Sequence, residues 1–202
     1  MCNALLNNLI DRGLDPERAR LFVIDGGKGI RSGIVSHFGR LALIQRCRVH
    51  KRRNVLNYLP EGERSFTRHK LERAWAYPDA RPAAAELRTL AKALSLKHPG
   101  AAASVLEGLE ETLTVTKLGL PPSLLQTFRS TNPIESMISI GSTVGRNVKR
   151  WRHGKMVLRW TAAGMLQAEK RCRRVRGYRE MPLLENALRQ HEEVINHKRE
   201  VA

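Results

Sequence analysis

Two acidic residues, Asp25 and Glu135, lie at the end of a predicted strand and at the start of a predicted helix, where a carboxylate could bind a metal ion. Asp25 ends the apolar, β-favouring run LFVID at 21–25 and is followed by two glycines. Glu135 lies in the segment STNPIE at 130–135, in the first turn of a predicted helix. Ligands of open α/β sheets bind beyond the carboxyl ends of strands, and a carboxylate holds Mg²⁺ through one or two oxygens. These residue types at these positions are therefore candidate ligands for a divalent cation.

Each acid also has a purely structural interpretation. An aspartate before Gly-Gly often caps the following helix. Asn132 as N-cap, Pro133 at the first helical position and Glu135 three residues after the cap resemble a capping box, in which the glutamate binds a backbone N–H. The residues alone leave both interpretations open for Asp25 and for Glu135.

Cys47 and His50 have half of the spacing of a zinc site. On a predicted helix the C-x-x-H spacing puts both side chains on one face. No second C-x-x-C or H-x-x-x-H pair follows, and only His153 and Cys172 are conceivable distant ligands. A closed Cys/His tetrahedron is therefore not expected, and packing or hydrogen bonding beside the active site is the predicted role.

Composition limits the class of protein. The 202 residues carry 36 Lys and Arg against 19 Asp and Glu, a formal charge of +17, and 42% are hydrophobic. This length allows one large domain or two small ones with a buried core. The three cysteines form no C-x-x-C pair, and no apolar stretch approaches the length of a membrane span. We therefore expect a soluble, cytoplasmic protein with a polyanionic partner.

The positive charge is concentrated in two blocks. Residues 46–73 have a net charge of +6 and residues 141–180 a net charge of +10, so the other residues together contribute +1. Two basic surfaces that bind nucleic acid are predicted, with Trp151, Trp160 and Tyr178 available for stacking; solvated basic helix faces are the alternative. The predicted DNA-binding residues are Arg46, Lys51, Arg52, Arg53, Arg146, Lys149, Arg150, Arg152 and Lys155.

The hydrophobic pattern predicts elements that would position these side chains. A helix is expected over 3–20, and strands over 21–25 and 41–45 flank a further helix. Two strands joined by one helix form a βαβ unit with parallel strands. A basic helix should follow over 46–59.

Beyond residue 60 the pattern is helical. Leu71 and Trp75 have i,i+4 spacing, and two apolar stripes of helical period follow: Leu87, Leu90, Ala91 and Leu94, then Val105, Leu109 and Leu113. A helix over 155–174 is expected to bury Met156, Val157, Trp160, Ala163 and Leu166. The polar tail from 185 to 202 should be frayed.

Five segments in this order resemble the Mutator-like transposases of bacterial insertion sequences. They are LFVIDGGKGI (21–30), IQRCRVHKRRNVL (44–56), AAASVLEGLEETLTV (101–115), STNPIES (130–136) and RNVKRWRHGKMVLRW (146–160). That family consists of DDE-type enzymes with a ribonuclease H-like core.

The resemblance implies an α/β fold that is predominantly helical overall, with a partial ribonuclease H-like core and an all-helical insertion. The implied regions are a strand–helix–strand part of the core at 1–59, the helical insertion at 60–125, C-terminal core helices with DNA-facing basic segments at 126–180, and the polar tail at 181–202.

The resemblance also assigns the site. Asp25 matches the family's second catalytic aspartate and Glu135 its glutamate, both as metal ligands, while Cys47, His50 and Asn132 belong to signatures near the site. The complete enzyme would use two Mg²⁺ or Mn²⁺ ions to cut and transfer DNA strands, with transposon ends and target DNA as partners. Self-association or association with intact transposase, and a place on the bacterial nucleoid when DNA is bound, are further expectations.

The family's first aspartate has no match here. The acids before Asp25 are Asp11, Asp15 and Glu17, and none lies in a β-type run. We therefore expect a truncated transposase that is inactive alone. The alternatives are a non-enzymatic DNA-binding module or repressor of intact transposase, and a structural zinc protein built on Cys47 and His50.

Overall fold

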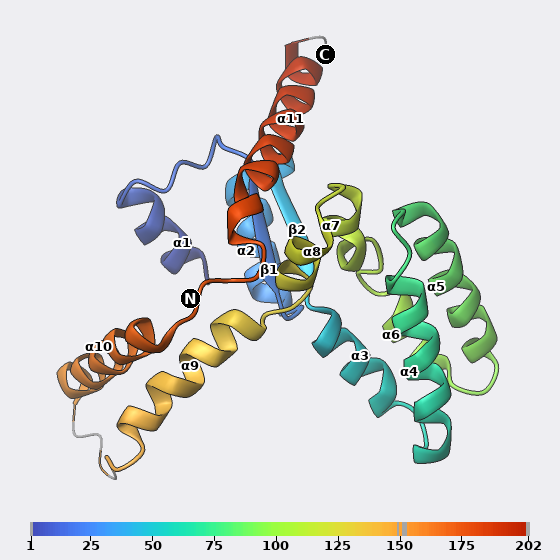
Figure 1. Cartoon of the computed structure of the whole chain (residues 1–202), viewed down its shortest axis with the longest axis horizontal. Helices are drawn as coiled ribbons and strands as arrows, with labels where there is room; N and C mark the ends of the chain where they lie inside the picture. The colour runs from blue at the N-terminus through green and yellow to red at the C-terminus, as the bar shows by residue number, and fades with distance from the viewer. Residues whose placement is uncertain (1, 149, 151–152, 201–202) are drawn as a thin grey trace.

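The computed structural model describes residues 2–148, 150 and 153–200, and the side chains of these residues up to 198 (Figure 1). Helices predominate in this part of the chain. In chain order the elements are α1 (Cys2–Asp11), β1 (Arg20–Ile24), α2 (Lys28–Phe38), the 3-10 turn η1 (Gly39–Leu41), β2 (Ala42–Arg46), α3 (Arg48–Asn57), α4 (Glu61–Trp75), α5 (Ala80–Ser95), α6 (Pro99–Leu106), η2 (Glu110–Leu113), α7 (Thr114–Lys117), α8 (Pro122–Phe128), α9 (Asn132–Gly145), α10 (Gly154–Arg171), η3 (Tyr178–Glu180) and α11 (Met181–Glu200).

A two-stranded parallel sheet lies at the centre of the molecule (Figure 1). Its register pairs Ile24 with Arg46, and α2 makes the crossover, which confirms the predicted strand–helix–strand unit. Ile34 and Phe38 of α2 pack against the strands, and the Phe38 ring lies 4.9 Å from that of Phe22. The small core formed in this way fixes the carboxyl ends of both strands at one edge.

The first helix is shorter than the predicted 3–20. It ends at Asp11, and Gly13 adopts a φ of 103°, a conformation that favours glycine over other residues. The Gly13 N–H then bonds to the Ile10 carbonyl in a tight turn, and the chain leads from there into β1.

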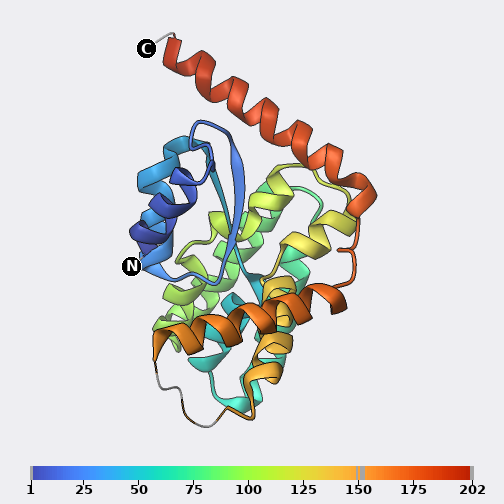
Figure 2. The same ribbon diagram turned by 90° about the vertical axis from the view of Figure 1, so that its left-hand side faces the viewer.

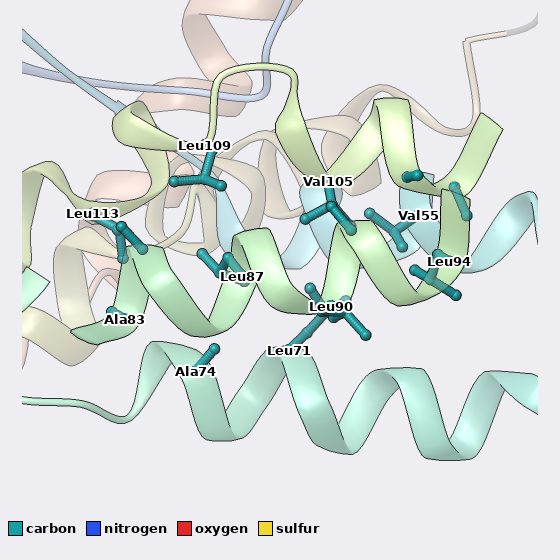
Figure 3. Packing of buried hydrophobic residues seen from close by; sticks show 14 of the residues in the cluster. Val55, Leu71, Ala74, Ala83, Leu87, Leu90, Leu94, Val105, Leu109 and Leu113 are labelled. Atoms are coloured by element: carbon teal, nitrogen blue, oxygen red, sulfur yellow. The ribbon is translucent and has the colours of Figure 1, made fainter. Parts of the chain in front are cut away.

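The middle segment is helical, as predicted, and has its own core (Figure 3). Leu87, Leu90 and Leu94 of α5 point toward neighbouring helices and are buried, and each leucine transferred from water contributes about 1.5–3 kcal/mol. The second predicted stripe is also buried, but it does not lie on one helix. Gly108, with a φ of 61°, separates α6 from η2.

The C-terminal segment corrects the prediction of a frayed tail. It forms the helix α11, whose partly buried Met181, Leu184 and Ala187, at a three-residue interval, pack against the cluster formed by α7 and α8. Farther along, Glu192 accepts a hydrogen bond from the Ala19 N–H at 3.0 Å. The end of α11 then extends past the sheet (Figure 2).

α9 and α10 form a hairpin that extends away from the rest of the molecule (Figure 1). They cross at two glycines: a Cβ at Gly164 would lie 2.7 Å from the Gly141 carbonyl oxygen. The helix predicted over 155–174 is present as α10, but its buried residues are Gly164 and Ala168. The predicted apolar face is wrong, because α10 packs on α9 through small residues, which leaves Val157 and Leu166 exposed.

No helix among the described residues combines the length and the apolar character that crossing a membrane requires.

Candidate functional site

Asp25 and Cys47 are neighbours at one edge of the sheet, because each directly follows one of the two parallel strands. The Cys47 N–H donates to the Ile24 carbonyl at 2.7 Å and so extends the pairing by one residue. Asp25 is exposed, and its Oδ1 accepts a hydrogen bond from the Gly27 N–H at 3.0 Å. The N-cap of α2 is Gly27. Asp25 therefore stabilises the turn before α2 and does not occupy the cap position.

Glu135 enters the site from the first turn of α9. The N-cap of this helix is Thr131, so Asn132 is the first helical residue and Pro133 the second. The prediction of Asn132 as cap is thus wrong, and the capping box does not form. The Thr131 hydroxyl donates to Glu135 Oε1, whereas the Glu135 N–H bonds to the Thr131 carbonyl. A side-chain bond from Thr131 therefore orients the carboxylate.

Cys47, His50, Thr131 and Glu135 form one contiguous cluster. The buried Cys47 Sγ lies 3.3 Å from His50 Nδ1 and accepts a hydrogen bond from the Thr131 N–H at 3.4 Å. His50 Nδ1 lies 3.7 Å from Glu135 Oε1. One ligand atom each from Cys47, His50 and Glu135 lie within 4.8 Å of one another. The start of α3 and the start of α9 are thereby joined at the sheet edge.

A backbone hydrogen bond supports this junction. The Arg48 N–H donates to the Arg129 carbonyl at 2.9 Å, two residues before Thr131. Asp25 lies at the same edge, next to Cys47, but is not part of the Cys47–His50–Glu135 group. The described part of this edge therefore offers the Asp25 carboxylate beside a group with sulfur, nitrogen and oxygen donors.

Arg46 and Lys51, predicted to face DNA, are buried. Arg46 donates two hydrogen bonds to the Glu107 carboxylate, at 3.0 and 2.9 Å, and Lys51 Nζ donates to the Glu107 carbonyl. The Lys51 side chain is only 2% exposed. Both cations thus fasten α3 and β2 to the end of α6, which corrects their assignment to a surface.

The pKa values of this group follow from its burial. Burial, followed by the nearby Arg46 charge, lowers the pKa of Lys51 to about 8. Hydrogen bonding from Arg46 is the main cause that lowers the pKa of Glu107. Arg46 Nε is buried without a hydrogen-bond partner in the described structure.

Arg48 lies in the wall of a cavity of about 380 Å³ that Arg52, Trp75 and Arg129 also line. It donates to the Trp75 carbonyl at 3.1 Å and to Thr116 Oγ1 at 2.7 Å. Burial and then the charge of Arg129 lower the pKa of Arg48 to about 10. Arg52 pairs with Glu72 at the surface, and Arg53 is exposed. The first basic block is therefore part interior and part surface.

The second basic block runs from the end of α9 through α10 to η3. Its predicted DNA contacts Arg146, Arg150 and Lys155 lie around the α9–α10 turn and are exposed. The predicted DNA contacts Lys149 and Arg152, and the predicted stacking residue Trp151, fall outside the described residues. Of the other predicted stacking residues, Trp160 lines the α9–α10 groove, and the Tyr178 ring lies 4.9 Å from the Arg174 guanidinium.

Two residues with a clear role were missing from the sequence prediction. Thr131 orients Glu135, and the signal for it is a hydroxyl residue four positions before the acid. Glu107 neutralises the two buried cations, but it lies 61 residues from Arg46 in the sequence, and no local pattern indicates this pairing.

Comparison with known proteins gives two findings. A family model described as "Transposase, Mutator family" matches residues 2–153, which include Asp25, Cys47, His50 and Glu135. The "Transposase for insertion sequence element IST2" of Acidithiobacillus ferrooxidans is 31% identical over 133 residues, which is 65% of this chain and 43% of that protein. The aligned region thus spans less than half the length of this relative.

Proposed function

Because the chain belongs to the Mutator family of transposases, we propose that it contributes Asp25 and Glu135 to metal-dependent cleavage and transfer of DNA strands. The observation that carries the proposal is the convergence of β1, β2 and α9: Cys47 lies beside Asp25 and also bonds to Thr131, which orients Glu135. Residues separated by more than a hundred positions are thereby brought to one sheet edge.

The donor chemistry of the two acids fits Mg²⁺ or Mn²⁺. Both carboxylates are accessible at the edge: Asp25 is exposed, and the Glu135 side chain is 47% exposed. Hard divalent cations prefer such oxygen ligands. When bound, the ions activate the attacking oxygen and stabilise the leaving oxygen. The turn bond from Gly27 and the hydroxyl bond from Thr131 would hold the two carboxylates toward those ions.

We further propose that the sheet with α9 and α10 belongs to a ribonuclease H-like core, which the segment at 60–125 interrupts as an insertion. The hydrophobic core from Leu71 to Leu113, separate from the core around the sheet, supports this division, and Val55, Leu56 and Leu59 of the preceding segment also pack into it. The first family aspartate would come from residues outside this chain, since Asp11 ends α1 and Asp15 lies in the turn that follows.

DNA is the proposed partner of the exposed basic residues Arg53, Arg146, Arg150 and Lys155 and of the half-buried Arg52. Counterion release makes such binding decrease steeply with salt. Arg150→Ala should weaken binding to any duplex and reduce the salt slope by about 1. Fluorescence anisotropy of a labelled duplex at two salt concentrations tests this, with Lys97→Ala, on the α5–α6 turn, as the control.

The catalytic proposal is tested by cleavage of transposon-end DNA with Mg²⁺ or Mn²⁺. The chain alone should show little or no cutting, and co-expression with the N-terminal part of a complete Mutator-family transposase, which would carry the first aspartate, should restore it. Asp25→Asn and Glu135→Gln should abolish the restored activity, whereas the control Asp11→Asn should keep it. Robust cutting by Asp25→Asn would overturn the assignment.

A non-enzymatic DNA-binding role is the second candidate, and the exposed arginines at the α9–α10 turn favour it. It predicts that Asp25→Asn leaves repression of intact transposase unchanged, whereas Arg150→Ala removes it. Association with a second copy or with intact transposase is supported by Leu158 and Leu166, which are 71% and 61% exposed on α10. Leu158→Lys should reduce the associated fraction in sedimentation experiments.

A further inference from the structure

We propose that Cys47, His50 and Glu135 form a binding site for one transition-metal ion of the zinc class. The three side chains offer a sulfur, a nitrogen and an oxygen, and these atoms all lie within 4.8 Å of one another. It shares the Glu135 carboxylate with the Mg²⁺ site proposed above, but it adds the sulfur of Cys47 and the nitrogen of His50 and does not include Asp25.

The distances match those of a tetrahedral ion. With a Zn–S bond of about 2.3 Å and Zn–N and Zn–O bonds of about 2.0–2.1 Å, the S···N edge is about 3.5 Å and the N···O edge about 3.3 Å. The observed separations are 3.3 Å between Cys47 Sγ and His50 Nδ1 and 3.7 Å between His50 Nδ1 and Glu135 Oε1. These two edges need shifts of only a few tenths of an ångström. The third edge, from Cys47 Sγ to the Glu135 carboxylate, lies within 4.8 Å against about 3.5 Å around an ion, so the exposed carboxylate would move by up to about 1.3 Å to coordinate.

The donor types select the class of metal. Thiolate and imidazole favour Zn²⁺, Co²⁺ and related ions, whereas Mg²⁺ requires oxygen ligands. Cys47 is buried, His50 is partly buried, and Glu135 lies toward solvent. Three protein ligands with one exposed side leave a fourth coordination position for water, as in zinc sites that are not purely structural.

Neighbouring groups hold the ligands in place. The Thr131 N–H donates to Cys47 Sγ at 3.4 Å, and the Thr131 hydroxyl donates to Glu135 Oε1. The Cys47 backbone is fixed by its hydrogen bond to Ile24. Such outer hydrogen bonds are typical of metal sites, where they orient the ligands and tune their affinity. They also reduce the conformational entropy that coordination must overcome.

The test is titration of the full chain, dialysed against a chelator, with Co²⁺. We expect one Co²⁺ per chain, a sulfur-to-cobalt charge-transfer band in the near ultraviolet, and displacement by Zn²⁺. Cys47→Ser should abolish the band, whereas Cys172→Ser, which changes an exposed cysteine, should keep it. Absence of the band in the wild type, or its persistence in Cys47→Ser, would overturn the proposal.

Two further variants keep the test decisive if Cys47→Ser does not fold. His50→Asn and Glu135→Gln change more exposed groups, and each should weaken Co²⁺ binding at least tenfold with the fold retained by circular dichroism. Wild-type affinity in both would refute the site. Because DNA and Mg²⁺ are not part of this experiment, its failure would leave the proposed strand cleavage standing. Asp25→Asn separates the two proposals, because Asp25 is not one of the three ligands: it should abolish cleavage and leave Co²⁺ binding unchanged.

Discussion

Lys51 gives the sharpest test of the interior, because its charge is buried beside another cation. Its pKa falls from 10.5 to about 8, mainly through burial and then through Arg46. Between about pH 8 and pH 10.5 the unfolded chain binds more protons than the folded chain. The free energy of unfolding should therefore rise with pH across this window. At pH values below about 8, Lys51 is charged in both states, so burial of the charge lowers the free energy of unfolding by its full amount there.

The size of the effect follows from the two pKa values. For a single lysine with these values, the free energy of unfolding rises by about 2 kcal/mol between about pH 7.5 and about pH 9.5. Lys51→Met keeps the length of the side chain and removes the titrating group. The variant should lack this part of the rise, although it also loses the donor to the Glu107 carbonyl at every pH.

Urea unfolding at the two pH values measures the difference, with Lys97→Met, on the exposed α5–α6 turn, as the matched control. The control should retain the wild-type rise. DNA affinity of Lys51→Met should equal that of the wild type, since the side chain is interior. An identical pH dependence in the wild type and Lys51→Met would refute the reasoning.

Three further predictions concern neighbouring features. Gly26→Ala should destabilise the fold more than Gly39→Ala does in urea unfolding. Both positions have a positive φ (106° and 52°), which costs alanine about 1–3 kcal/mol, but only at Gly26 would the new Cβ also lie 2.2 Å from a guanidinium nitrogen, whereas the space around Gly39 is open. Glu107→Gln should lower the free energy of unfolding at neutral pH. Urea unfolding should show the difference from the wild type shrinking in acid, because the lowered pKa of Glu107 stabilises the fold only at pH values where the wild-type carboxylate is ionised. Gly164→Leu should separate α9 from α10 and change the near-ultraviolet circular dichroism, whereas Gly154→Leu should not.

The sheet edge could be predicted from the sequence because local signals specify it. Two short apolar runs around a helical stripe give parallel strands, and parallel strands place Asp25 and Cys47 side by side. The three-residue spacing likewise brings His50 to Cys47. These features depend on residues close together in the chain, so the pattern contains them.

The remaining features depend on distant partners. The burial of Arg46 and Lys51 requires Glu107, and the order of α11 requires the apolar surface of α7 and α8. The role of Thr131 could not be predicted for a related reason. Its hydroxyl could bond to the backbone of the helix or to a side chain, and the structure shows a bond to the Glu135 carboxylate together with contact to the distant Cys47. Helical periodicity also predicted the wrong buried face for α10, because its packing on α9 at Gly141 and Gly164 determines which residues are buried.

The bonds between Cys47 and Thr131 join two points that are 84 residues apart. Closing a flexible loop of this length costs about 4 kcal/mol of chain entropy, but doubling its length adds only about 0.6 kcal/mol. The position of Glu135 is therefore nearly independent of how much chain lies between the two fastened points. The helices α4–α6 can therefore lengthen or shorten, provided that Glu107 still pairs with Arg46 and Lys51 and that the chain re-enters at the same backbone bond to Arg129.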